Sequence, residues 1–318
     1  MGTIKIYMNQ AKQSFLVDII IPTQLKNPEL LVLCLNALQK LQLKTDDQAD
    51  IALEVIIVAN TTQSSVDEFL QLHSQEAKLW RFPIQWKVMG SNSGFTGAVN
   101  AGVVLSHGPV IVLLNDDTQV TPSWLSELVS TQLKTKAEMV ASRVLTAESM
   151  GQSKENQVID SLGFTFLWRG KAEAIKEQDA PAYVRKQNDY WKNTPDLFAD
   201  VNEPFGPDGA AALYTREVWE KLDGMNETFF AYLEDVEFAL RARLGGARCT
   251  LATDAIVYHT KHATSQKVSH FKVKQDLVNW CRIAFTKYPL RIWYEFGLQI
   301  LFERCRNLSG FIKSYLNV

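Results

Sequence analysis

Apolar and polar positions follow two different periods along the first 140 residues. Short runs of aliphatic residues predict strands, and the segments between them carry apolar residues at helical spacing. In the helix that opens at Pro28, for example, Leu31, Leu35 and Leu38 fall on one stripe. This repetition is typical of βαβ units around a parallel sheet. The predicted strands are 15–21, 53–59, 84–89 and 110–114, and the predicted helices begin at Pro28 and cover 66–79 and 94–105.

The repetition becomes irregular after Trp124. Residues 174–206 are polar and rich in Asp, Gln, Lys and Pro, which predicts a loop insertion in a domain of residues 1–265. Around this insertion we expect helices up to Lys134 and over 216–222 and 235–244, and strands at 139–145, 210–214 and 248–257. The pattern as a whole predicts an α/β fold with a Rossmann-like, mostly parallel central sheet flanked by helices.

Residues 266–318 differ in kind and form a predicted helical C-terminal extension. They hold nine Lys and Arg against three Asp and Glu, a local charge of 9 − 3 = +6, and aromatic residues are interleaved with the cations. A basic, aromatic segment suits peripheral contact with a membrane, because Lys and Arg attract anionic lipid and Trp and Tyr prefer its interface. Two helices that bury their aromatic rings against the preceding domain explain the pattern equally well.

The composition excludes several classes of protein. A chain of 318 residues, 46% hydrophobic and 21% charged, builds a large core and is not disordered, collagenous or coiled-coil. Its net charge of −2 lacks the electropositive character of nucleic-acid-binding proteins. The four cysteines form no CxxC pair, so we expect neither zinc site nor disulfide framework, and a cytoplasmic location. We expect no secretory signal, and no run of 18 apolar residues occurs.

Two segments near predicted strand ends are candidates for ligand binding. Asn115, Asp116 and Asp117 follow the strand 110–114, at the edge where α/β sheets bind ligands, and their oxygens suit Mg²⁺ or Mn²⁺. A solvated turn before the next helix is the alternative. In SNSGFTGAVNAG, residues 91–102, the glycines allow close approach either to a ligand or to the neighbouring strand. Their spacing and late position differ from a dinucleotide-binding fingerprint, which disfavours a nicotinamide-dependent dehydrogenase.

Acidic and histidine side chains occur in two later segments. Glu234 and Asp235 begin a predicted helix behind three aromatic residues, whose apolar surroundings should raise carboxyl pKa values as a general base requires. Acidic residues in a first helical turn also simply complement the helix dipole. His259 and His262 follow the strand 248–257 and are either ligands of a metal or phosphate, or ordinary loop residues. His73 lacks such a context and is expected at the surface.

Five segments, in this order, resemble the inverting family 2 glycosyltransferases of the GT-A fold, in particular their bacterial rhamnosyltransferase-like branch. The resemblance covers about residues 15–265 and continues more weakly to Pro289. The segments are SNSGFTGAVNAG, LLNDD (113–117), PDGAAALYTREVW (207–219), GMNETFFAYLEDVEFALRAR (224–243) and the loop that contains His259.

The resemblance implies roles for individual residues. Asn115, Asp116 and Asp117 match the family's DxD-type motif. Asp117 and His259 would be ligands of a Mn²⁺ or Mg²⁺ ion that holds the donor diphosphate. His262 is a weaker candidate for the same ligand position as His259. Asp235 matches the general base, and Glu234 would orient the acceptor or shape its pocket. The residues that match the family's donor-binding edge and helix mouth are Pro22, Thr23, Asn60, Asn92, Gly94, Gly97 and Asn100.

The resemblance also implies a reaction. A sugar would pass from a UDP- or dTDP-linked donor to a hydroxyl of a polysaccharide or lipid-linked oligosaccharide, by single displacement on the cytoplasmic side of the membrane. In one departure, Ala59 and Asn60 stand where the family commonly has an Asp–Asn pair, so an acid that often contacts the base or ribose is missing. Either Asn60 or a backbone group replaces this acid, or donor binding is weakened. A degenerate domain that serves as a non-catalytic scaffold is the alternative.

Overall fold

Buried aliphatic runs build the central sheet. The computed structural model describes residues 14–176, 203–260 and 270–316. Its nine-stranded sheet has the order β3-β2-β1-β4-β10-β6-β11-β5, with β7 paired to β6. Six strands run in one direction and β5, β7 and β10 oppose them, which confirms the mostly parallel sheet. The strands are β1 (Ser14–Thr23), β2 (Asp50–Ala59), β3 (Ile84–Val88), β4 (Val110–Leu114), β5 (Thr118–Val120), β6 (Met139–Thr146), β7 (Ile159–Ser161), β10 (Ala211–Thr215) and β11 (Cys249–His259).

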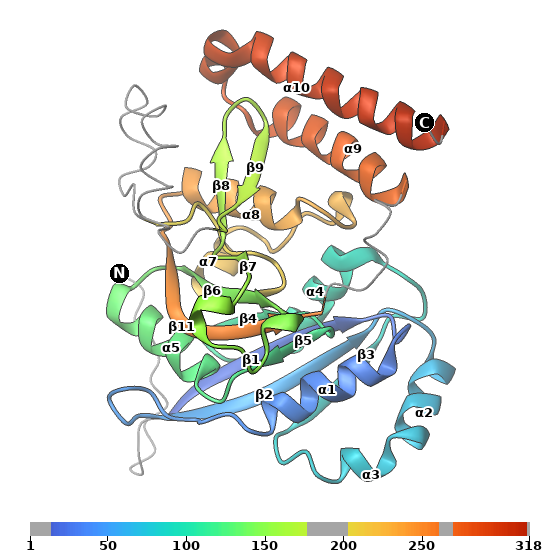
Figure 1. The fold of residues 1–318 in the computed structure, drawn as a ribbon, viewed down its shortest axis with the longest axis vertical. Coiled ribbons are helices and arrows are strands. Elements are labelled where there is room, and N and C mark those ends of the chain that lie inside the picture. Colours follow the sequence, from blue (N-terminus) through green and yellow to red (C-terminus); the bar gives the residue numbers. More distant parts are fainter. Residues whose placement is uncertain (1–13, 177–202, 261–269, 317–318) are drawn as a thin grey trace.

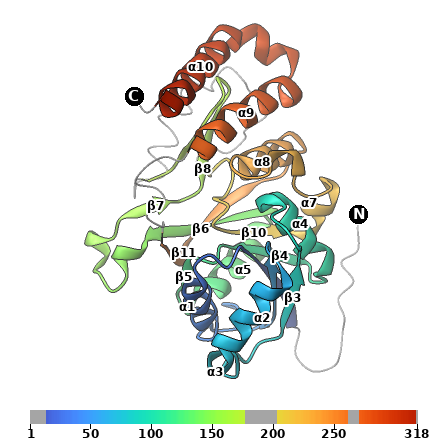
Figure 2. The ribbon, with the colours of Figure 1, turned by 90° about the vertical axis from the view of Figure 1, so that its right-hand side faces the viewer.

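Helices cover both faces of this sheet (Figures 1 and 2). Alternate residues of β1 enter two different cores: Ile19 and Ile21 pack with α1 and α5, whereas Ile20 packs with α4 and α8. Because both faces are covered, β4 is buried over its full length and its sequence is continuously apolar. The helices are α1 (Pro28–Leu38), α2 (Gln63–Leu72), α3 (Ser74–Ala77), α4 (Gly94–Leu105), α5 (Trp124–Thr135), α7 (Arg216–Lys221), α8 (Glu234–Leu244), α9 (His270–Lys287) and α10 (Leu290–Leu316).

The single helix predicted over 66–79 is wrong, because α2 and α3 are separate helices. His73 breaks the helix with φ −106° and ψ 28°. Its ring is buried against Phe69, with the ring centroids 4.9 Å apart, so the expectation that His73 lies at the surface is also wrong. Packing of this ring beneath the two short helices decides the local geometry, and the apolar spacing alone does not show it.

The sheet order creates a switch point between β1 and β4. The chain proceeds from β1 to β2 and β3 on one side, whereas β4 joins β1 on the other side. In open α/β sheets, ligands bind outside the carboxyl ends of the strands at such a point. The chain leaves β1 at Thr23, β2 at Ala59 and β4 at Leu114, so the predicted polar segments meet at this edge.

A hairpin and two long helices complete the described chain. The hairpin of β8 (Phe164–Leu167) and β9 (Lys171–Ala174) extends from the sheet toward α9 and α10 (Figure 1). Trp280 of α9 and Tyr288 are buried in the same apolar core as α8, so α9 packs on the preceding domain. No helix in the described ranges has the length and apolar character needed to cross a membrane. Most of the predicted insertion at 174–206 lies outside the described residues.

Candidate active site

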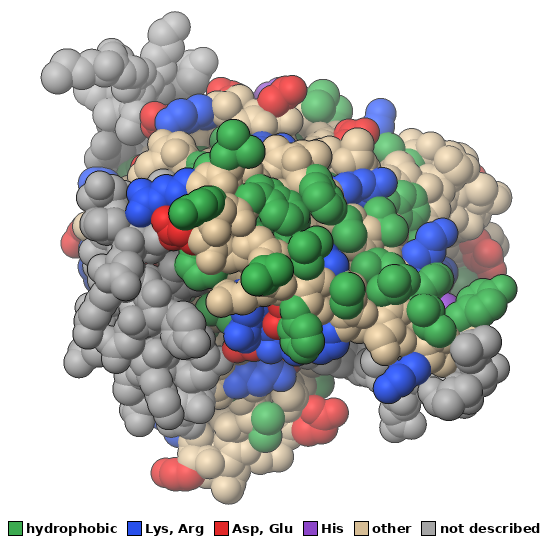
Figure 3. Space-filling model, turned by 90° about the horizontal axis from the view of Figure 1, so that it is seen from above, with side chains coloured by type: hydrophobic (Ala, Val, Ile, Leu, Met, Phe, Trp, Pro, Cys, Tyr) green, Lys and Arg blue, Asp and Glu red, His purple; other side chains and the backbone are tan. Residues whose placement is uncertain are grey.

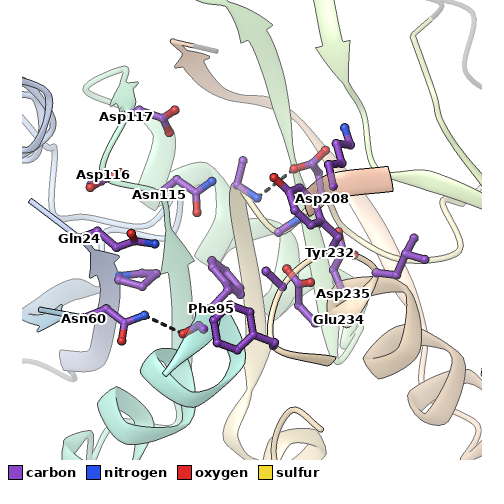
Figure 4. Close-up of a pocket in the computed structure, with 18 of the residues that line it drawn as sticks. Gln24, Asn60, Phe95, Asn115, Asp116, Asp117, Asp208, Tyr232, Glu234 and Asp235 are labelled. Carbon is purple, nitrogen blue, oxygen red and sulfur yellow. Dashed lines mark hydrogen bonds between the residues drawn. The ribbon is translucent and has the colours of Figure 1, made fainter. Parts of the chain in front are cut away.

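A cavity of about 1180 Å³ opens at the switch point. Strand ends contribute Pro22, Thr23 and Asn60 to one side of it, and the turn after β4 contributes the segment 115–117. The opposite side holds the start of α8, with Glu234 and Asp235. Figure 4 shows these two groups of polar side chains facing one cavity from different elements. The fold therefore brings together most of the residues that the sequence marked as candidates.

The side chain of Asn60 holds the turn that opens α4. Its Nδ2 donates to the Asn92 Oδ1, at 3.0 Å, and to the Gly94 carbonyl, at 2.8 Å (Figure 4). Its Oδ1 accepts from the backbone N–H and the hydroxyl of Ser93, at 2.7 and 2.9 Å. Both amide hydrogens and both lone pairs are therefore used inside the protein. Asn60 positions the N-terminus of α4. Its side chain has no free hydrogen-bonding group with which to replace the acid that the family commonly has at the position of Ala59.

Gly94 is required by a close backbone approach. Its φ is +79°, and a Cβ there would lie 2.4 Å from the carbonyl oxygen of Phe230. That same oxygen accepts from the N–H of Thr96 in the first turn of α4, at 3.3 Å. The glycine thus allows the aromatic segment before α8 to close over the helix mouth.

Two predicted donor-binding residues lie elsewhere. Gly97 does not line the cavity, and a Cβ there would face Ser93 of its own helix at 3.0 Å. Asn100 faces the segment that precedes α8, where its Nδ2 donates to the Met225 carbonyl, at 2.8 Å, and its Oδ1 accepts from the Met225 N–H, at 2.9 Å. The helical rotation of α4 turns both residues away from the cavity. Only the first turn of this helix, with Gly94, faces it.

The two carboxylates of the turn after β4 point in different directions. Asp116 Oδ2 accepts from the Thr23 hydroxyl at 2.5 Å, which ties the ends of β1 and β4 together. Asp117 Oδ1 instead lies 3.3 Å from Nε2 of His259. The sheet creates this second contact, because β11 pairs with β5 and sets His259 opposite Thr118. Asp117 and His259, 142 positions apart in the numbering, thereby become neighbours.

Asp160 completes this group and was not predicted. Its Oδ2 lies 3.2 Å from Nδ1 of His259, and the carboxylate is almost fully buried on β7. Burial alone would lower the pKa of His259, but hydrogen bonds to Asp117 and Asp160 raise it to about 10. An acceptor at Nδ1 holds the ring so that Nε2 faces Asp117, the arrangement commonly found for metal-binding histidines. His262 lies outside the described residues.

The side chains of Asp117 and His259 are suited to bind a divalent ion together. In the part of the chain that the structure describes, no three His, Cys, Asp or Glu side chains form a complete metal site. Asp117 and His259 supply one oxygen and one nitrogen, and Asp160 orients the imidazole. Mn²⁺ and Mg²⁺ commonly take their remaining ligands from substrate phosphates and water. The two side chains therefore suit an ion that arrives with a diphosphate.

Glu234 is buried and Asp235 is half-buried at the opposite side of the cavity. The two oxygens of Asp235 accept from backbone N–H groups, Oδ1 from Val236 at 2.8 Å and Oδ2 from Gly209 at 3.2 Å. Glu234 Oε2 is buried without a hydrogen-bond partner among the described residues. Burial and repulsion from Asp235 raise the pKa of Glu234 to about 8, and burial and repulsion from Asp208 raise that of Asp235 to about 7. The pair can therefore exchange a proton near neutral pH.

A strained segment presents this pair. Phe230, with φ 60° and ψ −62°, is the central residue of a γ-turn closed by a 2.7 Å bond from the Ala231 N–H to the Phe229 carbonyl. Tyr232 and Leu233 also have positive φ, of 68° and 64°. Each non-glycine residue in such a backbone conformation lowers the stability of the fold by about 1–3 kcal/mol, so contacts with the surrounding structure must hold the segment.

Asn279 of α9 holds the strained segment from behind. Its side chain is fully buried, and Nδ2 lies 3.0, 3.0 and 2.7 Å from the carbonyl oxygens of Phe229, Ala231 and Tyr232. The C-terminal segment is therefore part of the site, and sequence reasoning missed this. The charge and aromatic content of 266–318 predict that this segment differs from the rest of the chain. They do not predict the role of Asn279, because a single buried Asn leaves no periodic pattern in the sequence.

Several further lining residues were not predicted. Gln24 and Phe95 lie beside the strand ends, and Asp208 and Tyr232 lie near the acidic pair (Figure 4). Asp208 belongs to the segment PDGAAALYTREVW, so the resemblance marked its position without a role. From α9, the cavity receives Phe271, Lys272, Asp276 and Trp280.

Comparison with known proteins identifies a family and relatives. The family model described as glycosyl transferase family 2 matches residues 18–217. The low-salt glycan biosynthesis hexosyltransferase Agl10 of Haloferax volcanii is 23% identical over 193 residues, which are 57% of this chain and 54% of that protein. The chain thus spans about half the length of this curated relative. The rhamnosyltransferase-like branch is not shown by these matches.

Solved structures share the fold. The mannosyltransferase PcManGT from Pyrobaculum calidifontis, in complex with GDP-Man and Mn²⁺, aligns with a TM-score of 0.55 at 14% identity, over 94% of this chain and 73% of that one. GalNAc-T7 with UDP, GalNAc and Mn²⁺ aligns with a TM-score of 0.61 at 13% identity, over 88% of this chain and 49% of that one. These likenesses confirm the predicted GT-A fold.

Proposed function

The chain belongs to glycosyl transferase family 2, and from this premise we propose that it transfers a sugar from a nucleoside diphosphate donor to a hydroxyl group of a glycan. The reaction is a metal-dependent single displacement that inverts the anomeric carbon. The observation that carries the proposal is the placement of two different groups in one cavity. Asp117 and His259 suit a diphosphate-bound cation, and Glu234 and Asp235, with raised pKa values, suit an acceptor hydroxyl.

Asp117 and His259 would hold the Mn²⁺ or Mg²⁺ ion. When bound, such an ion acts as a Lewis acid that stabilises the charge developing on a diphosphate leaving group. Asp160 fixes the imidazole so that Nε2 faces the site, and Thr23 fixes Asp116 beside it. The Mn²⁺ in PcManGT and GalNAc-T7 supports this assignment by fold likeness.

Asp235 acts as the general base. Its oxygens are held by the Gly209 and Val236 N–H groups, which orient the carboxylate. A pKa of about 7 means that Asp235 is partly ionised near neutral pH and still basic enough to take a proton from a hydroxyl. Glu234 lines the cavity beside Asp235 and shapes the acceptor pocket.

The donor is a UDP-linked hexose or dTDP-rhamnose, and the acceptor is a polysaccharide or lipid-linked oligosaccharide on the cytoplasmic side of the membrane. The Agl10 relative supports a hexosyl donor. Since Asn60 is fully engaged and Ala59 has no polar side chain, the base is recognised by other groups. Gln24, which lines the cavity beyond β1, is the candidate we favour for that contact.

Calorimetry tests this proposal. UDP, dTDP and GDP are titrated into the protein with Mn²⁺ or Mg²⁺, then with EDTA, and the titration is repeated with Asp117→Ala. We expect one nucleotide to bind only with metal and to lose affinity in the variant, while Asp67→Ala on the exposed face of α2 binds as the wild type does. Absence of binding by all three nucleotides under either metal would refute the proposal and favour the non-catalytic scaffold.

A further inference from the structure

The outer face of α10 carries an apolar stripe. Its most exposed members, Tyr294, Leu290 and Leu298, have 93%, 87% and 87% of their surface accessible and follow one another at intervals of four residues. Residues spaced in this way lie on one side of a helix. The exposed apolar side chains of α10, which we call the α10 stripe, are Leu290, Tyr294, Leu298, Leu301, Phe302, Leu308, Ile312 and Tyr315.

The opposite face of α10 holds the helix in place. Ile292 and Ile300 are buried in the core that includes α9. The Arg304 guanidinium lies 5.0 Å from the Trp280 ring and donates to the Gly170 carbonyl in the β8–β9 turn, at 2.5 Å. The position of α10 is therefore fixed without its outer face. Folding does not explain why eight large apolar side chains face outward, and large exposed apolar patches commonly mark interaction sites.

We propose that the α10 stripe docks on an anionic membrane surface. Charge supports this occupant. Residues 266–318 carry a charge of +6, and exposed Arg291, Arg306 and Lys313 lie on the same helix as the stripe. Figure 3, which looks down on this end of the molecule, shows hydrophobic side chains gathered across the face with Lys and Arg among and beside them. An apolar face bordered by cations is typical of helices that lie in the plane of a lipid interface.

The charge of +6 already counts the three acidic residues of this segment, and two of them pair with arginines of α10. Glu303 is buried between Arg169 and Arg306, at 3.5 and 2.6 Å, and Glu295 pairs with Arg291 at 2.7 Å. Asp276 lines the cavity instead. A second copy docked stripe to stripe would bring two segments of charge +6 together, which disfavours that occupant. Anionic lipid complements the same charge.

Docking in this way would bring the site to the lipid surface. In Figure 1, α10 forms the outermost layer and α9 lies beneath it. From α9, Phe271, Lys272 and Trp280 line the cavity. If the acceptor is lipid-linked, as the proposed function has it, its sugar would be presented at this end. The docking itself does not rest on the transfer reaction, so the two proposals fail separately.

Vesicle co-sedimentation tests the docking. The protein is mixed with vesicles of phosphatidylcholine alone or with added phosphatidylglycerol. We expect binding to the anionic vesicles, and about a hundredfold weaker binding for Tyr294→Ser/Leu298→Ser, because each of the two apolar side chains removed from the interface costs about a factor of ten in the equilibrium constant. Arg291→Gln/Lys313→Gln should weaken binding about fivefold for each charge. Leu72→Ser/Val104→Ser, which removes two exposed apolar side chains elsewhere, should bind as the wild type does.

Three results would overturn the proposal. These are absence of binding to anionic vesicles, equal loss of binding in the Leu72→Ser/Val104→Ser control, and equal binding to neutral and anionic vesicles. Light scattering without lipid tests whether a second copy of the chain binds the α10 stripe instead. A dimer that dissociates in Tyr294→Ser/Leu298→Ser would assign the stripe to that second copy and would also overturn the proposal. Circular dichroism on all variants confirms that lost binding does not reflect unfolding.

Discussion

Ionisation of Glu234 should destabilise the ligand-free protein. Burial and repulsion from Asp235 raise the pKa of this carboxyl from an ordinary 4.5 to about 8. Between these two values the folded chain binds more protons than the unfolded chain, so its stability falls as the pH rises through this window. Glu234→Gln replaces the carboxyl with a neutral group of the same shape. The variant should therefore be more stable than the wild type at high pH and nearly equal to it at low pH.

The size of this effect follows from the shift. For an isolated carboxyl, a rise from 4.5 to about 8 lowers the free energy of unfolding by about 4 kcal/mol at about pH 8 and by about 1 kcal/mol at about pH 5. Part of the shift is shared with Asp235, which remains in the variant. We therefore expect Glu234→Gln to raise the free energy of unfolding by about 2 kcal/mol at about pH 8, which corresponds to roughly 4 °C in Tm for a chain of this size.

Thermal unfolding in EDTA at several pH values between these limits measures the effect. Glu68→Gln, an exposed change on α2, serves as the control and should follow the wild-type curve. The gain in stability should accompany a loss of transfer activity, because active sites commonly keep groups that destabilise the fold. Parallel Tm curves for wild type and Glu234→Gln, or a variant less stable at high pH, would refute this reasoning.

Three further predictions follow from the site. Asp160→Asn should weaken Mn²⁺ binding in the presence of nucleotide by about 10- to 100-fold, because the ring of His259 loses its orienting carboxylate; calorimetry with Mn²⁺ would detect this, and unchanged affinity would contradict it. Gly94→Ala should lower the free energy of unfolding by at least about 2 kcal/mol more than Gly90→Ala, since both have positive φ but only Gly94 faces a backbone oxygen; equal values in urea unfolding would count against the close approach. Asn279→Ala should cost about 2–3 kcal/mol, because three carbonyl groups of the strained segment lose their donor, and hydrogen exchange at Ala231 should accelerate; unchanged exchange there would argue against the role.

The sequence alone predicts the central strands of the sheet and the polar residues that follow their carboxyl ends. Runs such as 110–114 are apolar because both faces of the strand are covered, and this local pattern predicted β4 to the residue. The polar segment after each strand then had to lie at one edge, since parallel strands share their carboxyl ends. For this reason the sequence predicts Asn115, Asp116 and Asp117 at this edge, whereas it predicts Glu234 from its place at a helix start behind aromatic residues.

The tertiary structure decided which of these side chains face each other and which do not. Asp160 contacts His259 only because β7 and β11 both pair with β6. Asn60 and Asn100 have the same chemistry, but hydrogen bonds show that one holds the helix mouth and the other faces a different segment. A hydrophobic pattern reports whether a position is buried, and it carries no information on the partner, because partners are brought together by strand pairing over long separations.

The C-terminal segment shows the same division. Its charge and aromatic content are properties of the sequence, and they allowed both packing and membrane contact. In the fold, α9 packs on the domain and buries Asn279 and Trp280, whereas α10 leaves Tyr294 and Leu298 exposed. Composition counts aromatic residues without regard to direction. The rotation of each helix about its axis, which is set by packing against α8 and the β8–β9 hairpin, determines which of them meet the core and which meet the surroundings.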